Sequence, residues 1–167
     1  PGFCLSSYEV GNASIQFSKL YKNSSSPDHN SYSLVVKPLP DHSFSIMGVT
    51  EYQDHFVLQI DSLGNVFNSI GFPNNSIKIR NQEVDQGGNI TIAGRHWKYP
   101  DLAHQGYTYF IARFNSNLEL QWAKEFEMDN SYCDRADLSL YPDGTAFFMF
   151  YTVGHFPMAI GQLSLEG

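Results

Sequence analysis

The residues best suited to chemistry gather in one stretch, residues 95–106, which holds two histidines, a tryptophan, a tyrosine and a lysine. Exposed aromatic rings on a loop suit stacking on sugar rings or on a partner chain. The alternative is a loop that folds its rings against its own sheet. The candidate ligand-binding residues are therefore His96, Trp97, Tyr99 and His104.

A metal site on this stretch is the obvious second hypothesis, because two of the histidines flank Asp101. Their spacing matches no established ligand pattern, and a carboxylate between two histidines arises easily by chance. We therefore expect no metal here.

The rest of the chain carries no established catalytic motif. His55 and His155 each precede a phenylalanine at a position where Tyr109 stands in a related segment, which is typical of packing. Residues 139–145 fail the Asp-box pattern of sialidase-like propellers, because Asp143 directly precedes the glycine and no tryptophan follows. The sequence has no G-x-S-x-G, no phosphate-binding glycine loop and no H-E-x-x-H. We expect no catalytic residue and no cofactor, although an acid pair for glycoside hydrolysis stays open.

The elements that would position these side chains repeat along the chain. Residues 55–72 align without a gap on residues 109–126, and each copy is an alternating apolar strand, a polar turn and a second strand. That pattern predicts a β-hairpin. Turn-forming residue pairs occur at 41–42, 87–88 and 143–144. Each pair lies between two apolar segments, which we expect to be two further strands.

The full unit is thus four strands, at a spacing typical of a four-stranded propeller blade. The sequence predicts an all-β, β-propeller-like repeat of about three four-stranded antiparallel blades. It predicts one domain over residues 1–167, with repeat units at 31–75, 76–130 and 131–167, the last joined by 8–21.

The two ends of the chain suggest how the last unit is completed. Residues 162–167 resemble residues 59–64, where the turn into a fourth strand begins, and residues 15–21 match residues 120–126. We expect the N-terminal strand to complete the last blade, in its own chain or in a neighbouring subunit. The chain as a segment of a longer protein, a ring of copies, and a head-to-tail filament all remain open. The candidate assembly residues are Ile15, Phe17, Leu20, Met158, Ile160 and Leu163.

Composition narrows the class of protein. The apolar fraction is 42%, with 13 Phe and 10 Tyr, which provides a core and favours strands. A formal charge of −7 with scattered basic residues argues against a nucleic-acid partner. No apolar run is long enough for a membrane span.

Two further features favour an extracellular location. Sequons occur at Asn12, Asn23, Asn74 and Asn89, and the first three fall in predicted turns, where a glycan fits better. In a secreted chain, Cys4 and Cys133 would make a disulfide across the ring closure; two free thiols are the alternative.

Residues 56–65 and their copy from Phe110 to Trp122 resemble the repeat of secreted bacterial β-propellers, and are also similar to quinoprotein-like propeller repeats. The likeness departs at Leu118, where the first copy has Gly64. It implies the fold, and function only weakly, because propellers host enzymes, binders and scaffolds alike. We expect a secreted, non-enzymatic structural or recognition module that assembles with copies of itself or with flanking repeats. A carbohydrate-binding module is the alternative, and a glycoside hydrolase or quinone-dependent enzyme the third.

Overall fold

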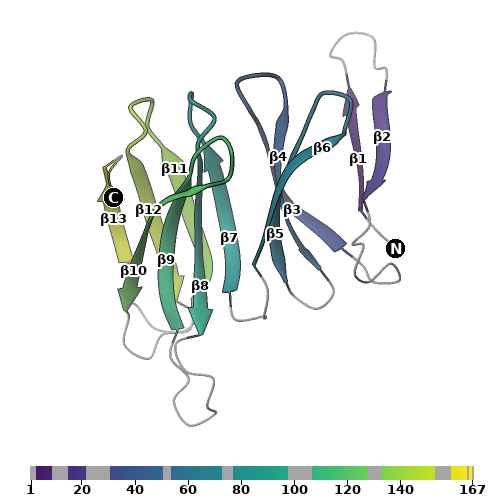
Figure 1. Ribbon diagram of the computed structural model, residues 1–167. Helices are drawn as coiled ribbons and strands as arrows, with labels where there is room; N and C mark the ends of the chain where they lie inside the picture. The colour runs from purple at the N-terminus through teal and green to yellow at the C-terminus, as the bar shows by residue number, and fades with distance from the viewer. Residues whose placement is uncertain are drawn as a thin grey trace. The chain divides into compact units, whose positions relative to one another are not determined.

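The computed structural model describes residues 3–8, 15–21, 31–50, 54–72, 77–97, 107–127, 133–152, 159–164 and 166. All regular structure in these residues is β-strand (Figure 1). The chain divides into two compact units, Pro1–Phe72 and Pro73–Gly167. The expectation of one domain over residues 1–167 stays a prediction.

The first unit contains a two-stranded and a four-stranded sheet. The strands are β1 (Phe3–Tyr8), β2 (Ile15–Tyr21), β3 (Ser31–Pro38), β4 (Phe44–Thr50), β5 (His55–Ile60) and β6 (Val66–Phe72). The four-stranded sheet has the order β3-β4-β5-β6, so each strand pairs with its neighbour in sequence. Short turns between consecutive strands make this antiparallel order the simplest one to form.

The second unit contains a four-stranded and a three-stranded sheet. Its strands are β7 (Ile77–Val84), β8 (Ile90–Trp97), β9 (Tyr107–Phe114), β10 (Leu120–Glu127), β11 (Cys133–Leu140), β12 (Ala146–Thr152) and β13 (Ala159–Leu163). The orders are β10-β9-β8-β7 and β11-β12-β13. The prediction of an all-β chain of antiparallel repeat-like sheets is confirmed, whereas the boundaries of the repeat units stay predictions. The propeller arrangement stays a prediction.

Five hairpin turns share one geometry. The first residue donates its N–H to the carbonyl of the fifth, and the fourth donates back to the carbonyl of the first. In three turns an aspartate or asparagine occupies the first position and accepts N–H groups from the third and fifth residues, as Asp61 does from Leu63 and Asn65 at 2.9 and 2.7 Å. This side-chain bonding explains why these residues favour turns. The fourth residue has positive φ in every case: His42, Gly64, Gly88, Leu118 and Gly144.

Replacing His42 by glycine is therefore expected to stabilise the protein by about 0.5–1 kcal/mol, because a side chain at φ 66° is strained. Gly88 and Gly144 occupy the same turn position in the other two sheets. Chemical denaturation would measure the gain. Gly144→Ala is the reciprocal variant and should lose about 1 kcal/mol. A His42→Gly variant no more stable than the wild type would contradict the argument.

The N-terminal strands form a hairpin of their own. β2 pairs with β1 in a two-stranded sheet, and among the described strands β13 pairs with β12 alone. The hairpin is local, because β1 precedes β2 directly and its closure is short. Completion of the last sheet by residues 15–21, in the same chain or in a neighbouring subunit, stays a prediction.

The register of β1 and β2 shows what this hairpin is. Phe3 pairs with Tyr21 as Tyr109 pairs with Phe126, and both hairpins skip one residue near the turn, Gln16 or Gln121. The β5–β6 hairpin skips Phe67 at the same place. β1 and β2 thus correspond to the third and fourth strands of a repeat.

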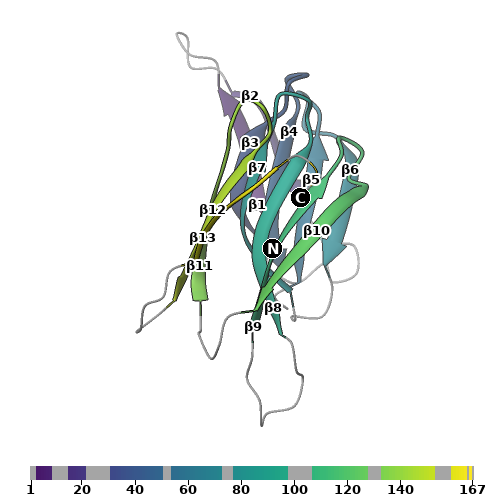
Figure 2. The same cartoon turned by 90° about the vertical axis from the view of Figure 1, so that its left-hand side faces the viewer.

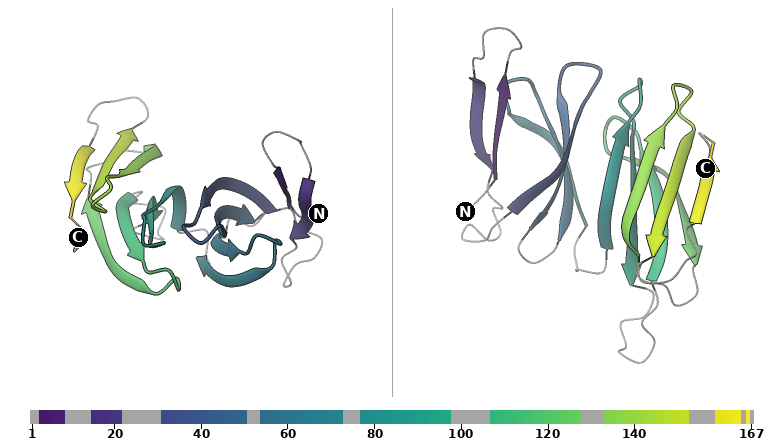
Figure 3. Two further views of the ribbon diagram at one scale, coloured as in Figure 1. Left: turned by 90° about the horizontal axis from the view of Figure 1, so that it is seen from above. Right: turned by 180° about the vertical axis from the view of Figure 1, so that it is seen from behind.

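The core of the second unit lies between its two sheets. Tyr109 of β9 contacts Phe150 of β12 with ring centroids 5.1 Å apart, and Phe126 of β10 lies 4.9 Å from Phe148. Around these rings, Ala93 and Ile111 from one sheet and Ala136, Leu138 and Ala146 from the other are fully or almost fully buried. The two sheets therefore pack face to face, as Figures 2 and 3 show.

Candidate functional site

The candidate ligand-binding residues are only partly described. His96 lies near the end of β8, where Nε2 is 3.0 Å from Oε1 of Glu125 on β10 and the ring centroid is 6.4 Å from that of Phe110. Trp97 ends β8, and its backbone pairs with Tyr107. Tyr99 and His104 lie outside the described residues. His96 is therefore held against its own sheet, and the ligand-binding role of the four stays a prediction.

The predicted modification sites are also only partly described. Asn12, Asn23 and Asn74 lie outside the described residues. Asn89 is the last residue of a turn, and its side-chain amide donates to both carboxylate oxygens of Asp85 at 3.2 and 2.9 Å. A glycan on that nitrogen would replace one of its two hydrogens and so remove at least one of these bonds. Cys4 lies in β1 and Cys133 begins β11, and their predicted disulfide stays a prediction.

The candidate assembly residues occupy two strands. Ile15, Phe17 and Leu20 lie in β2, in the pair with β1. Ile160 and Leu163 lie in β13 on opposite faces: Leu163 packs against the buried cluster, whereas Ile160 is exposed. Met158 lies outside the described residues. Of these two residues of β13, Leu163 is thus covered within the chain, whereas Ile160 is open to solvent.

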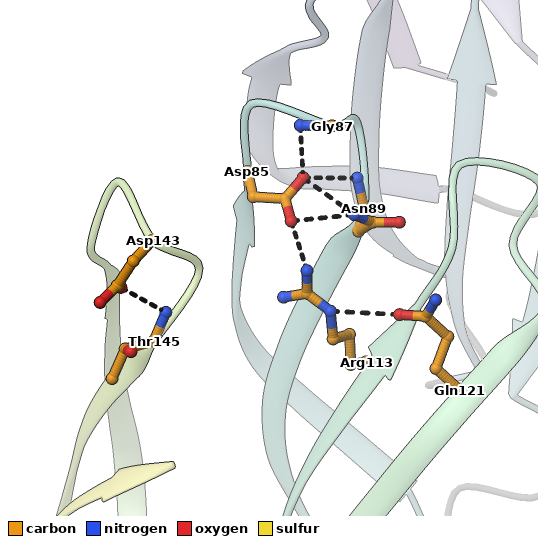
Figure 4. A network of polar contacts seen from close by, with 7 residues as sticks. All are labelled: Asp85, Gly87, Asn89, Arg113, Gln121, Asp143 and Thr145. Carbon is orange, nitrogen blue, oxygen red and sulfur yellow. Dashed lines mark hydrogen bonds and ion pairs between the residues drawn. The ribbon is translucent and has the colours of Figure 1, made fainter. Parts of the chain in front are cut away.

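The most connected polar group is a network that the sequence reasoning missed (Figure 4). Asp85, at the first position of the β7–β8 turn, accepts N–H groups from Gly87 and Asn89 at 2.8 and 2.9 Å. Its other oxygen pairs with Nη2 of Arg113 on β9, and Arg113 Nε donates to Gln121 Oε1 at 3.1 Å. The side chains of Arg113 and Asp85 are only 4% and 10% exposed.

The electrostatics of this network suit structure rather than proton transfer. Burial raises the pKa of the Asp85 carboxyl, but the hydrogen bonds from Asn89 and the charge of Arg113 outweigh it and hold that pKa below 3.8. A carboxylate with a lowered pKa is a poor proton acceptor near neutral pH. The pair instead ties the β7–β8 turn to β9.

A second feature missed from sequence is the outer face of the last sheet, which is the side of β11–β13 turned away from the β7–β10 sheet. It carries Phe147, Met149 and Tyr151 on β12 and Ile160 on β13, in alternation with the buried Phe148 and Phe150. Phe147 and Ile160 are exposed. The internal repeat of the sequence could have revealed this face, because Phe147 occupies the position at which the other two sheets have the polar residues Ser45 and Thr91.

No group of three or more histidine, cysteine, aspartate or glutamate side chains among the described residues could hold a metal ion.

The described part of the chain contains no helix of the length and hydrophobicity needed to cross a bilayer.

The sequence matches no family model and no curated protein. The resemblance to secreted propeller repeats therefore stays a prediction.

Proposed function

We propose that the chain is a non-enzymatic β-repeat module that works by assembling with copies of itself outside the cell, as a structural or recognition element. The observation that carries the proposal is the unequal strand content of its sheets. The β3–β6 and β7–β10 sheets have four strands, whereas β11–β13 has three and leaves one edge of β13 without a described partner. A backbone edge of this kind is a template for pairing with another chain.

The register of the N-terminal hairpin supports the same proposal. β2 repeats the pairing of β6 and β10, which are the fourth strands of their sheets. A strand of the fourth-strand type is therefore present at the other end of every copy; one of its edges pairs with β1, and the other has no described partner and could meet β13. Heterologous contact between such ends builds rings or filaments.

The polar chemistry of the described residues favours this role over catalysis. The best-connected carboxylate, Asp85, is committed to Arg113 and to backbone N–H groups. The extracellular location rests on the four sequons of the sequence, and in that location Cys4 and Cys133 would form a disulfide.

The test is the mass of the wild-type particle in solution over a wide range of concentration, by sedimentation velocity. We expect species larger than the 18.9 kDa chain, growing with concentration. A chain that stays single at every concentration would dismiss the proposal.

A further inference from the structure

We infer that the outer face of the last sheet docks a second copy of this chain, on the face of its β3–β6 sheet that carries Val36. The inference rests on the proposed function, since it names the surface through which self-assembly would occur. It differs from edge pairing, because here whole sheet faces meet.

The internal repeat defines which faces correspond. In each of the three sheets, the first residue after the turn between the first two strands pairs with a residue of the third strand. The pairs are Phe44 with Ile60, Ile90 with Phe114, and Ala146 with Leu163. Counting from these pairs, Ile160 occupies the position of Val57 and Ile111. Likewise Phe147 occupies the position of Ser45 and Thr91.

These positions are covered in the other sheets and open in the last one. Ile160 is 54% exposed, whereas Val57 and Ile111 are 1% and 0% exposed. Phe147 is 37% exposed, whereas Ser45 and Thr91 are fully buried. Two large apolar side chains therefore stand in solvent at positions that the repeat otherwise buries.

The second unit shows what covers such a face. On the β7–β10 sheet, the side that carries Ala93, Tyr109 and Ile111 is covered by the β11–β13 sheet, through Leu138, Phe148 and Phe150. The equivalent side of β11–β13 is its outer face. A second repeat sheet would therefore cover this outer face, through the side that corresponds to the one carrying Leu138 and Phe148 in β11–β13.

The β3–β6 sheet of a second copy presents that side. Val36 pairs with Ile46 in this sheet, and Leu138 pairs with Phe148 in the last sheet. Ile46 and Phe148 occupy equivalent repeat positions, so Val36 is the equivalent of Leu138. Val36 is 44% exposed, whereas Leu138 is 5% exposed. Phe44, Phe56 and Leu58 on the same side are half-buried. Ile46 on the same side is fully buried, so Val36 is the exposed part of this face. It is the part that the outer face of another copy would cover in a head-to-tail contact.

The experiment uses two full-length variants, Val36→Lys and Ile160→Lys, each of which places a positive charge on one of the two faces. Each variant alone should lose about a hundredfold or more in association constant, since a buried unpaired charge is costly. Mixed together, they retain one intact pair of faces, because Val36→Lys keeps its outer face and Ile160→Lys keeps its Val36 face, whereas the other two faces carry like charges that repel. The mixture should form a particle of two chains and nothing larger.

Leu63→Lys is the matched control, since Leu63 is an exposed apolar residue in a turn and should associate like the wild type. Phe147→Thr is a milder second variant, which restores the residue type of Thr91 and should also weaken association. Circular dichroism confirms that each variant folds.

Three outcomes would overturn the inference. Continued association of Val36→Lys alone would mean that two outer faces meet each other. Wild-type behaviour of both charged variants would exclude these faces while leaving the proposed self-assembly standing. A wild type that is a single chain at every concentration would dismiss both.

Discussion

Replacing Asp85 by asparagine is expected to lower the free energy of unfolding by about 3 kcal/mol. The substitution preserves the size of the side chain and an oxygen that can accept the N–H groups of Gly87 and Asn89. It removes the charge that faces Arg113, whose side chain is almost fully buried. An unpaired buried guanidinium is the source of the loss, and urea denaturation at neutral pH measures it.

Asp61→Asn is the matched control. Asp61 occupies the first position of the β5–β6 turn and accepts the corresponding N–H groups. The equivalent residue of the β9–β10 turn is already an asparagine, Asn115, which accepts from Asn117 and Glu119 at 3.0 and 2.9 Å. Asp61→Asn should therefore change stability by less than about 0.5 kcal/mol. Equal losses in the two variants would show that the turn, and not the ion pair with Arg113, needs the charge.

The pH dependence follows from the lowered pKa of Asp85. A carboxyl with a lower pKa in the folded state stabilises the protein above the unfolded pKa of about 4, and this contribution is lost as the pH falls through the folded value. The difference between wild type and Asp85→Asn should thus be full at neutral pH and shrink at acid pH. A difference that stays constant down to acid pH would contradict the pairing.

Many of the strands and turns could be predicted because they depend on neighbours in sequence. The alignment of residues 55–72 on 109–126 predicts two hairpins, and the structure gives both the same register and the same skipped residue. The pairs Gly87-Gly88 and Asp143-Gly144 predict turns, and both turns form. Alternating polarity and local hydrogen bonding suffice for these features.

The Asp85–Arg113 pair could not be predicted in the same way. The two residues are 28 positions apart in sequence. They come together only because β7, β8 and β9 lie side by side in one sheet, which places the β7–β8 turn near Arg113 on β9. Residues 3–8 were not predicted as a strand, because the N-terminal segment assigned to the last repeat unit comprised only residues 8–21. The exposed Phe147 and Ile160 become meaningful only when the burial of the equivalent positions is known.

Replacing Gly94 by alanine is expected to cost about 1–3 kcal/mol. A Cβ on Gly94 would lie 2.4 Å from the carbonyl oxygen of Lys78 and 3.0 Å from Cα of Ile79. These are backbone atoms of β7, where the pairing with β8 skips Arg80 and brings the two strands together. A methyl group can be accommodated only by moving β7 away from β8, with which it pairs. Urea denaturation of the variant measures the cost.

Gly71→Ala is the control, because a Cβ on Gly71 in β6 would meet nothing within 4 Å. It should be neutral, or stabilising by up to about 1 kcal/mol through a less flexible unfolded chain. The third sheet shows how the fold accommodates a large residue at the Gly94 position. There Phe150 pairs with Ala136, and the skipped residue moves to Asp134, further from that pair. Equal stability of Gly94→Ala and Gly71→Ala would mean that the second sheet can make the same shift.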